Sequence, residues 1–138
     1  MNARSIGAVL GGIVSVFVLS LGIDEILHLT GVYPPWSERM SDALFSLATS
    51  YRIVIGVVGG YVTARLAPRA PMRHALVMGG IGLGLSLVGV IISSSQPNLG
   101  PLWYPLALVV TALPCAWAGG ALYRPRSSSE LSHGALEK

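Results

Sequence analysis

Four long runs of apolar residues, separated by short polar stretches, dominate the pattern along the chain. They cover about residues 6–29, 43–66, 75–93 and 102–123. A helix needs about 20 apolar residues to cross the hydrocarbon core of a bilayer, and each run is close to or above that length. Lipid offers the backbone no hydrogen-bond partners, and the runs lack the alternation of transmembrane β-strands. Each run is therefore predicted to be a membrane-spanning α-helix.

The sequence thus predicts an all-α membrane protein with four transmembrane helices. We assign residues 1–126 to one four-helix transmembrane domain and the polar residues 127–138 to a disordered cytoplasmic tail. The two predicted hairpins resemble each other, since segment 8–13 (AVLGGI) is similar to segment 76–81 (LVMGGI). A duplicated two-helix unit would explain this likeness. The biased composition of membrane helices would explain it equally well, and the pattern leaves both interpretations open.

Composition and charge placement agree with a lipid environment. Only 11% of the 138 residues are charged, whereas 52% are hydrophobic, and a soluble domain carries roughly 25% charged residues. Loops on the cytoplasmic side of a membrane protein carry an excess of Lys and Arg. Here one side has only Arg39, and the other side has Arg4, Arg65, Arg69, Arg73, Arg124 and Arg126. We therefore expect both termini and the middle loop to be cytoplasmic.

Each predicted span also carries two small residues four positions apart. Membrane helices associate through close backbone approach, which small residues permit. We expect these faces to be used inside the bundle, whereas a face left unused would favour a homo-oligomer. The pairs are Gly7/Gly11, Gly56/Gly60, Gly80/Gly84 and Ala116/Gly120.

One polar cluster lies within the predicted spans. Asp24, Glu25 and His28 stand in the outer part of the first span, and Tyr51 and Arg52 lie inside the second. A charge within a span costs at least ~2.5 kcal/mol, so ionisable residues there are candidates for function. One carboxylate is expected to pair with Arg52, but helical spacing leaves open which one does so.

Two interpretations of this cluster remain open. The ion pair could fix the register between the first two spans and serve packing alone. Alternatively, carboxylate, imidazole and guanidinium groups could form a periplasm-facing site that relays protons or holds a polar substrate. The spacing Glu25-x-x-His28 also occurs in di-iron bundles, but such a site needs a second motif that this chain lacks. We therefore expect no metal and no cofactor.

Other classes of function find little support in the sequence. No basic face interleaved with aromatic residues indicates nucleic-acid binding. The chain contains no Gly-x-Ser-x-Gly, no Gly-rich phosphate loop and no His-Glu-x-x-His. Cys115 lies in an apolar run without a basic neighbour, so we interpret it as an inert core residue. No catalytic residues are predicted.

Several strings resemble a group of small, uncharacterised bacterial integral membrane proteins. They are GVYPPW at 31–36, ATSYR at 48–52, GGYVTARLAP at 59–68 and WYP at 103–105. The resemblance covers most of the chain except the tail, and it implies a multi-pass protein of the bacterial inner membrane without adding catalytic residues. The length and four spans are also similar to those of small multidrug transporters. Their membrane-embedded Glu lies deeper in the first helix than Glu25, and no motif matches.

The sequence therefore favours a non-enzymatic accessory or scaffold protein that contacts membrane lipid and forms, if a face is left unused, a homo-oligomer. The alternative is a small transporter or proton-linked permeation protein that uses Asp24, Glu25, His28 and Arg52. No feature of the sequence indicates a small-molecule substrate.

Overall fold

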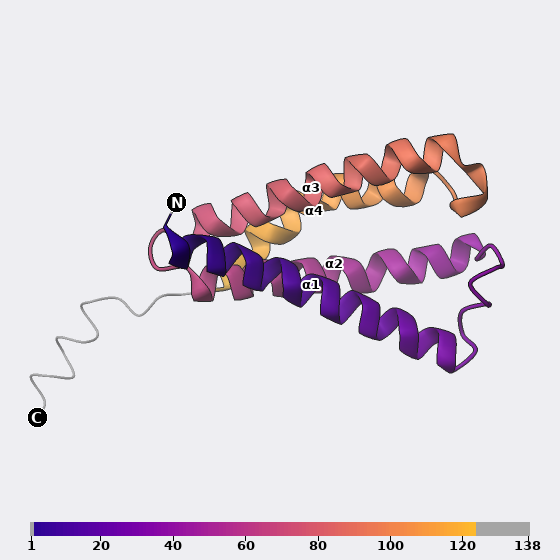
Figure 1. Ribbon diagram of the computed structural model, residues 1–138, viewed down its shortest axis with the longest axis horizontal. Helices are drawn as coiled ribbons and strands as arrows, with labels where there is room; N and C mark the ends of the chain where they lie inside the picture. The colour runs from indigo at the N-terminus through magenta and orange to yellow at the C-terminus, as the bar shows by residue number, and fades with distance from the viewer. Residues whose placement is uncertain (1, 124–138) are drawn as a thin grey trace, which may run out of the picture.

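The computed structural model describes residues 2–123, which form four long helices and one short 3-10 turn (Figure 1). The helices are α1 (Ala3–Leu29), α2 (Asp42–Leu66), α3 (Pro71–Ser95) and α4 (Trp103–Leu122), and η1 (Pro97–Leu99) precedes α4. All four helices are long and apolar enough to cross a membrane. The predicted fold class, an all-α membrane protein with four spanning helices, is confirmed. Whether the two hairpins arose by duplication stays a prediction.

The helix bounds differ from the predicted spans by at most four residues. The largest difference is at α3, which begins at Pro71 instead of residue 75. Proline suits the first turn of a helix because its fixed φ is already helical and its missing N–H has no partner there. Hydropathy marks only the part of a helix that lipid covers, so the polar first turn was missed. The predicted tail at 127–138 lies outside the described residues.

Short polar side chains begin the first two helices. The Asn2 side chain accepts a hydrogen bond from the Ser5 backbone N–H, and Ser41 accepts one from Leu44 at the start of α2. Such caps satisfy N–H groups that the first turn leaves free. At the other end of α1, Gly31 adopts a positive φ of 77°, which glycine tolerates without steric cost. The chain can therefore leave α1 sharply before the proline pair that follows.

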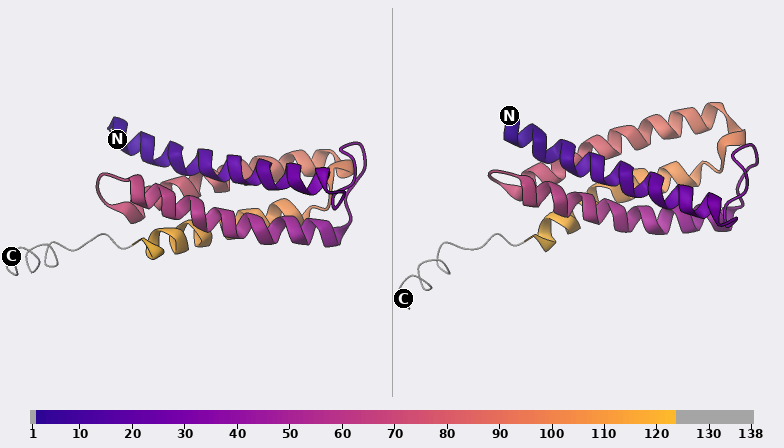
Figure 2. Two further views of the ribbon diagram at one scale, coloured as in Figure 1. Left: turned by 90° about the horizontal axis from the view of Figure 1, so that it is seen from below. Right: turned by 60° about the horizontal axis from the view of Figure 1, so that its bottom comes forward.

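The helices form a bundle that is closed at one end and spread at the other. α2 packs against the other three helices and α4 packs against α2 and α3, whereas the backbones of α1 and α4 stay more than 8 Å apart, Cα to Cα, among the described residues. The N-terminus and the α2–α3 connection lie at one end of the bundle (Figures 1 and 2). Toward the opposite end, α1 and α3 move apart (Figure 1). We call this second end, with its α1–α2 and α3–α4 connections, the loop end.

Small residues hold the helices together where they cross closely. A Cβ added at Gly60 would lie 2.6 Å from the Ala116 carbonyl oxygen, and one at Gly119 would run into the Val57 carbonyl. A Cβ at Gly12 would likewise collide with Thr63, whose side chain is fully buried. These contacts join α2 to α4 and α1 to α2. The backbones approach so closely that only glycine fits.

The predicted small-residue pairs are used unequally. Gly11, Gly56, Gly60, Ala116 and Gly120 pack against other helices. A Cβ at Gly7, Gly80 or Gly84 would instead meet no atom of the described chain within 4 Å. The expectation that all four faces are used inside the bundle is therefore wrong for α3. Its neighbouring glycine, Gly79, makes the contact with α4 instead.

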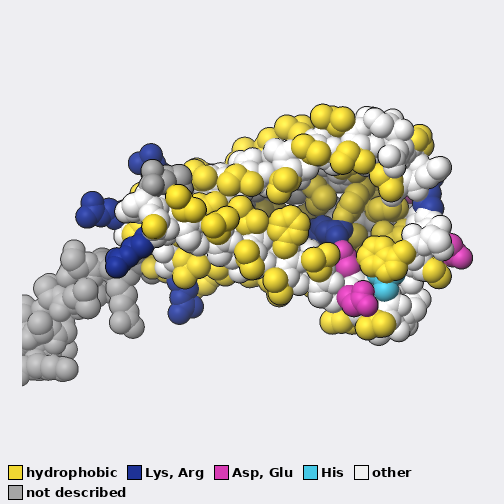
Figure 3. Space-filling model, in the orientation of Figure 1, with side chains coloured by type: hydrophobic (Ala, Val, Ile, Leu, Met, Phe, Trp, Pro, Cys, Tyr) yellow, Lys and Arg dark blue, Asp and Glu magenta, His cyan; other side chains and the backbone are white. Residues whose placement is uncertain are grey.

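Aliphatic side chains cover the outside of the bundle (Figure 3). Val18 is 63% exposed, Ile91 64% and Val110 72%, and many other large apolar residues face outward. A soluble monomer rarely exposes so large a continuous apolar surface. The exterior of this bundle therefore suits lipid as its solvent.

Candidate functional site

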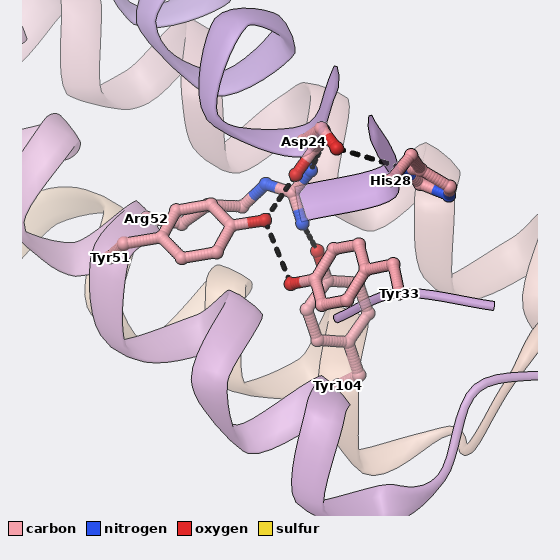
Figure 4. A network of polar contacts seen from close by, with 6 residues as sticks. All are labelled: Asp24, His28, Tyr33, Tyr51, Arg52 and Tyr104. Carbon is pink, nitrogen blue, oxygen red and sulfur yellow. Dashed lines mark hydrogen bonds and ion pairs between the residues drawn. The ribbon is translucent and has the colours of Figure 1, made fainter. Parts of the chain in front are cut away.

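A network of polar side chains ties three helices together near the loop end (Figure 4). We call it the polar clasp, and it consists of Asp24 from α1, Tyr51 and Arg52 from α2, Tyr104 from α4, and Tyr33 from the α1–α2 connection. At 1.5 Å per residue, Asp24 lies about 7–8 Å before the end of α1, and Arg52 lies about 15 Å into α2. The clasp thus lies in the part of the spanning helices nearest the loop end.

An ion pair is at the centre of the clasp. Arg52 Nη2 donates to Asp24 Oδ2 at 2.6 Å, and the two side chains are only 25% and 13% exposed. The carboxylate that pairs with Arg52 is therefore that of Asp24. Glu25 is exposed on the neighbouring face of α1, as expected for consecutive helical residues, which point about 100° apart.

Tyrosine hydroxyls complete the hydrogen bonding of this pair. Tyr51 donates to Asp24 Oδ1, so both oxygens of the carboxylate are bound. Because the Tyr51 hydrogen is directed at Asp24, the buried Tyr33 donates to the Tyr51 oxygen, at 3.0 Å. Arg52 Nη1 donates to the Tyr104 hydroxyl. Within residues 2–123, no buried side-chain polar atom lacks a partner.

The guanidinium also lies close to the ring of Tyr51, with Arg52 Cζ 5.6 Å from the ring centroid. A cation within about 6 Å of a ring face is attracted by its quadrupole, more strongly where water is absent. Tyr104 offers its hydroxyl instead of its ring face, because Arg52 Nη1 binds that hydroxyl while Cζ is 5.6 Å from the ring centroid. The carboxylate, the Tyr51 ring and the Tyr104 hydroxyl together offset the cost of placing Arg52 inside a span.

Glu25 lies outside the clasp, whereas His28 borders it and meets the Tyr33 ring edge-on, with ring centroids 5.2 Å apart. His28 Nδ1 is 2.7 Å from the backbone carbonyl oxygen of Asp24. Because a carbonyl can only accept, Nδ1 carries the hydrogen. The His28 ring stacks on Trp36, with centroids 3.9 Å apart and an interplanar angle of 10°. The five predicted site residues therefore separate into two groups, with His28 and Glu25 facing the α1–α2 connection.

Sequence reasoning missed two members of the clasp, Tyr33 and Tyr104. Tyrosine is common at the membrane interface, so neither residue stands out in the sequence. The only signal in the sequence was that each stands at the outer boundary of a span, at a depth similar to that of Asp24. Their contacts with Tyr51 and Arg52 join residues 18 and 52 positions apart, which no local pattern reveals.

An apolar groove of about 430 Å³ lies between α1 and α3, with α2 and α4 forming its floor. We call it the α1/α3 groove. Its walls are mostly aliphatic, and polar groups from Asp24, Arg52 and Tyr104 close it toward the loop end. In the space-filling view, a basic and an acidic side chain lie at the bottom of the hollow between the α1 and α3 ribbons (Figure 3). The clasp is therefore the polar end of an otherwise apolar groove.

The described residues contain no group of three His, Cys, Asp or Glu side chains that could hold a metal ion. Cys115, the single cysteine, is buried and lines the groove. Comparison of the chain with protein-family models, with curated proteins and with solved structures found no match.

Proposed function

We propose that this protein is a non-enzymatic accessory or scaffold protein of a bacterial inner membrane, with both termini in the cytoplasm. The observation that carries the proposal is the closed state of the polar clasp. Both oxygens of Asp24 are bound by Arg52 and Tyr51. A carboxylate whose two oxygens are both bound by side chains of the neighbouring helix serves to hold α1 to α2.

The distribution of charge supports the proposed orientation. Arg4, Arg65, Arg69 and Arg73 gather at the end of the bundle opposite the loop end (Figure 3). At the loop end, Arg39 stands beside Glu38 and Asp42. The positive-inside rule then directs the four-arginine end to the cytoplasm. The resemblance to small bacterial membrane proteins agrees with this location.

The partner of such a scaffold is proposed to be a second copy of the chain. Gly80 and Gly84 leave open space on the outer face of α3, and small residues four apart allow close contact between membrane helices. We expect Gly84→Leu to shift a cross-linkable dimer in detergent toward monomer. Gly22→Leu is the matched control, since Gly22 also has open space but no small partner at residue 18 or 26. Equal cross-linking of both variants and the parent protein would argue against an α3 interface.

The alternative function, proton-linked permeation, is favoured by one observation. The α1/α3 groove reaches Asp24, so opening of the clasp would expose a carboxylate inside a membrane-embedded hollow. Intramembrane carboxylates of this kind act as proton relays in pumps and transporters.

Proton flux separates the two functions without knowledge of a substrate. The full chain is placed in vesicles that carry a pH-sensitive dye, and a pH step is applied. A scaffold gives no flux above that of empty vesicles, in the parent protein or in Asp24→Asn. Flux in the parent protein that disappears in Asp24→Asn and persists in Glu25→Gln would establish permeation and overturn the scaffold proposal.

A further inference from the structure

We propose that the α1/α3 groove binds one hydrocarbon chain of an ester lipid from the leaflet at the loop end, with an ester carbonyl oxygen accepting a hydrogen bond from Arg52. The inference depends on the size, lining and depth of the groove and on the spare donors of the clasp. It does not depend on the scaffold function proposed above.

The groove has the dimensions of a ligand site and the lining of a hydrocarbon site. Its volume of about 430 Å³ lies within the range of small-molecule pockets, roughly 300–1,000 Å³. Its walls are mostly apolar, and the hydroxyls of Ser86 and Thr111 on these walls donate to carbonyls of their own helices. The hydroxyls of Ser20 and Ser93 also line the groove and make no hydrogen bond within residues 2–123. Apart from these two hydroxyls, the walls offer a ligand apolar contact.

The position of the groove along the bundle matches one leaflet. On α1 its lining runs from Ile13 to Asp24, which is about 16 Å of helix at 1.5 Å per residue. The hydrocarbon core is about 30 Å thick, so one leaflet contributes about 15 Å. A chain that enters at the clasp and extends inward thus fills the groove over the thickness of its own leaflet.

The groove opens sideways toward lipid. Phe17 and Leu21 on the α1 rim are 51% and 63% exposed, and Leu85 on the α3 rim is 52% exposed. An empty apolar groove leaves its lining without contact partners on one side. Lipid chains are the most abundant apolar molecules beside such an opening, so a chain can enter from the bilayer without crossing water.

The polar end selects an acceptor that carries no full charge. Arg52 has five N–H donors, of which one binds Asp24 and one binds Tyr104. Within residues 2–123 the other three N–H groups make no hydrogen bond. The Asp24 carboxylate already balances the charge of Arg52, so a neutral acceptor is favoured over an anion. An ester carbonyl lies at the junction of headgroup and chain, and the Arg52 guanidinium is drawn toward that level by Tyr104, which stands in the first turn of α4.

Photolabelling in vesicles tests the proposal. The full chain is reconstituted with phosphatidylcholine that carries a diazirine midway along one ester-linked chain, and labelled residues are mapped by mass spectrometry. We expect labelling of groove residues such as Val16 and Leu85 above that of outward residues such as Val18. Gly82 lines the groove with open space at its Cβ position. Gly82→Leu should lower groove labelling about tenfold, equivalent to ~1.4 kcal/mol of binding free energy.

Two controls keep the result interpretable. Gly22→Leu places the same side chain on α1 away from the groove lining and should leave labelling unchanged. Ser86→Leu fills the same groove and replaces Gly82→Leu if that variant fails to fold, as judged by circular dichroism and gel filtration. Groove labelling no higher than outward labelling, or labelling that persists in a folded, filled variant, overturns the proposal.

A lipid with ether-linked chains tests the carbonyl contact. It carries the same diazirine but lacks the ester carbonyl oxygens. We expect its labelling of the groove to be about tenfold weaker, since a hydrogen bond to a charged donor is lost. Equal labelling by ester and ether lipids would overturn the proposed hydrogen bond from Arg52 to the ester carbonyl. Cross-links between two copies of the chain through groove residues, without lipid labels, would assign the groove to a second copy.

Discussion

At the residue scale, the central feature is that one charge pair in a lipid-exposed bundle is fully supported by neighbouring side chains. Asp24 is bound by Arg52 and Tyr51, and Arg52 is bound by Tyr104. Removing one partner of a buried pair costs more than removing both, because a single removal leaves a charge without compensation. The clasp is therefore expected to behave as one cooperative unit.

A double-mutant cycle tests this unit. We expect Asp24→Asn and Arg52→Gln each to lower the free energy of unfolding in detergent by about 1–3 kcal/mol, less than for a fully buried pair because both side chains are partly exposed. The double variant should recover much of this loss. Glu25→Gln is the control, since Glu25 is exposed, and surface changes usually stay within about 0.5 kcal/mol. Additive losses in the double variant would show that Asp24 and Arg52 are not energetically coupled and would contradict a cooperative clasp.

The hydroxyl of Tyr51 should contribute more to the free energy of unfolding than a tyrosine hydroxyl without hydrogen-bond partners. Tyr51→Phe removes the donor to Asp24 Oδ1 and the acceptor for Tyr33. Leaving buried polar atoms unpaired costs about 1–3 kcal/mol, and we expect a destabilisation of that size in denaturant titrations. Tyr61→Phe on the same helix is the control, because the Tyr61 hydroxyl makes no hydrogen bond among the described residues, although its ring meets that of Tyr123. If both changes lowered the free energy of unfolding equally, the special contribution of the Tyr51 hydroxyl would be contradicted.

At the scale of the helices, adjacent glycine pairs set the distances between elements. Each helix contains one such pair, at residues 11–12, 59–60, 79–80 and 119–120. At least one member of every pair contacts another helix closely. Close contact between backbones supplies the dispersion attraction that drives association in lipid, where burial of apolar surface gains little.

Adding a side chain at one of these helix crossings should lower the stability of the bundle strongly. Gly119→Ala would place its Cβ against the Val57 carbonyl and the Tyr61 N–H of α2, both rigid backbone groups. We expect a loss of about 1–3 kcal/mol or more, as for overpacking in a well-packed core. Gly22→Ala meets open space and should be neutral, or stabilising by up to ~1 kcal/mol through helix propensity. Thermal unfolding of both variants is compared in the same detergent. Equal unfolding midpoints would contradict the close packing of α4 on α2 at Gly119.

At the scale of the whole molecule, the bundle is polarised from end to end. Four arginines gather at the closed end, whereas the clasp and the groove lie toward the spread loop end. The direction in which the bundle inserts therefore decides which leaflet the groove faces, and the positive-inside rule supports the proposed direction. The lipid proposal therefore places the bound chain in the periplasmic leaflet if the termini are cytoplasmic.

Cysteine labelling in intact cells tests the orientation. In a Cys115→Ala background, Asn98→Cys at the loop end should react with a membrane-impermeant maleimide before the cells are opened. Ala70→Cys, in the α2–α3 connection, should react only afterwards. The two positions are both exposed, so accessibility from each side of the membrane decides the outcome. The opposite labelling pattern would reverse the proposed topology.

The sequence by itself determined the elements of this protein. Apolar run length fixes four membrane helices because lipid leaves the backbone no alternative. Polar end turns, such as that at Pro71, escape this signal because hydropathy does not mark them. The sequence also located the intramembrane charges, since a charge in a span is rare and conspicuous.

Only the tertiary structure decided how those elements use their side chains. It selected Asp24 over Glu25, because the rotation of α1 about its axis is set by packing of glycines against α2. It brought Tyr104 to Arg52 from 52 residues away, and it left α3 with an open face and a groove toward α1. Which helix faces meet, and where a groove forms, depends on the angles and positions at which the helices cross. Hydrophobic patterning carries little information on these crossings in lipid, because nearly every face of each helix is apolar.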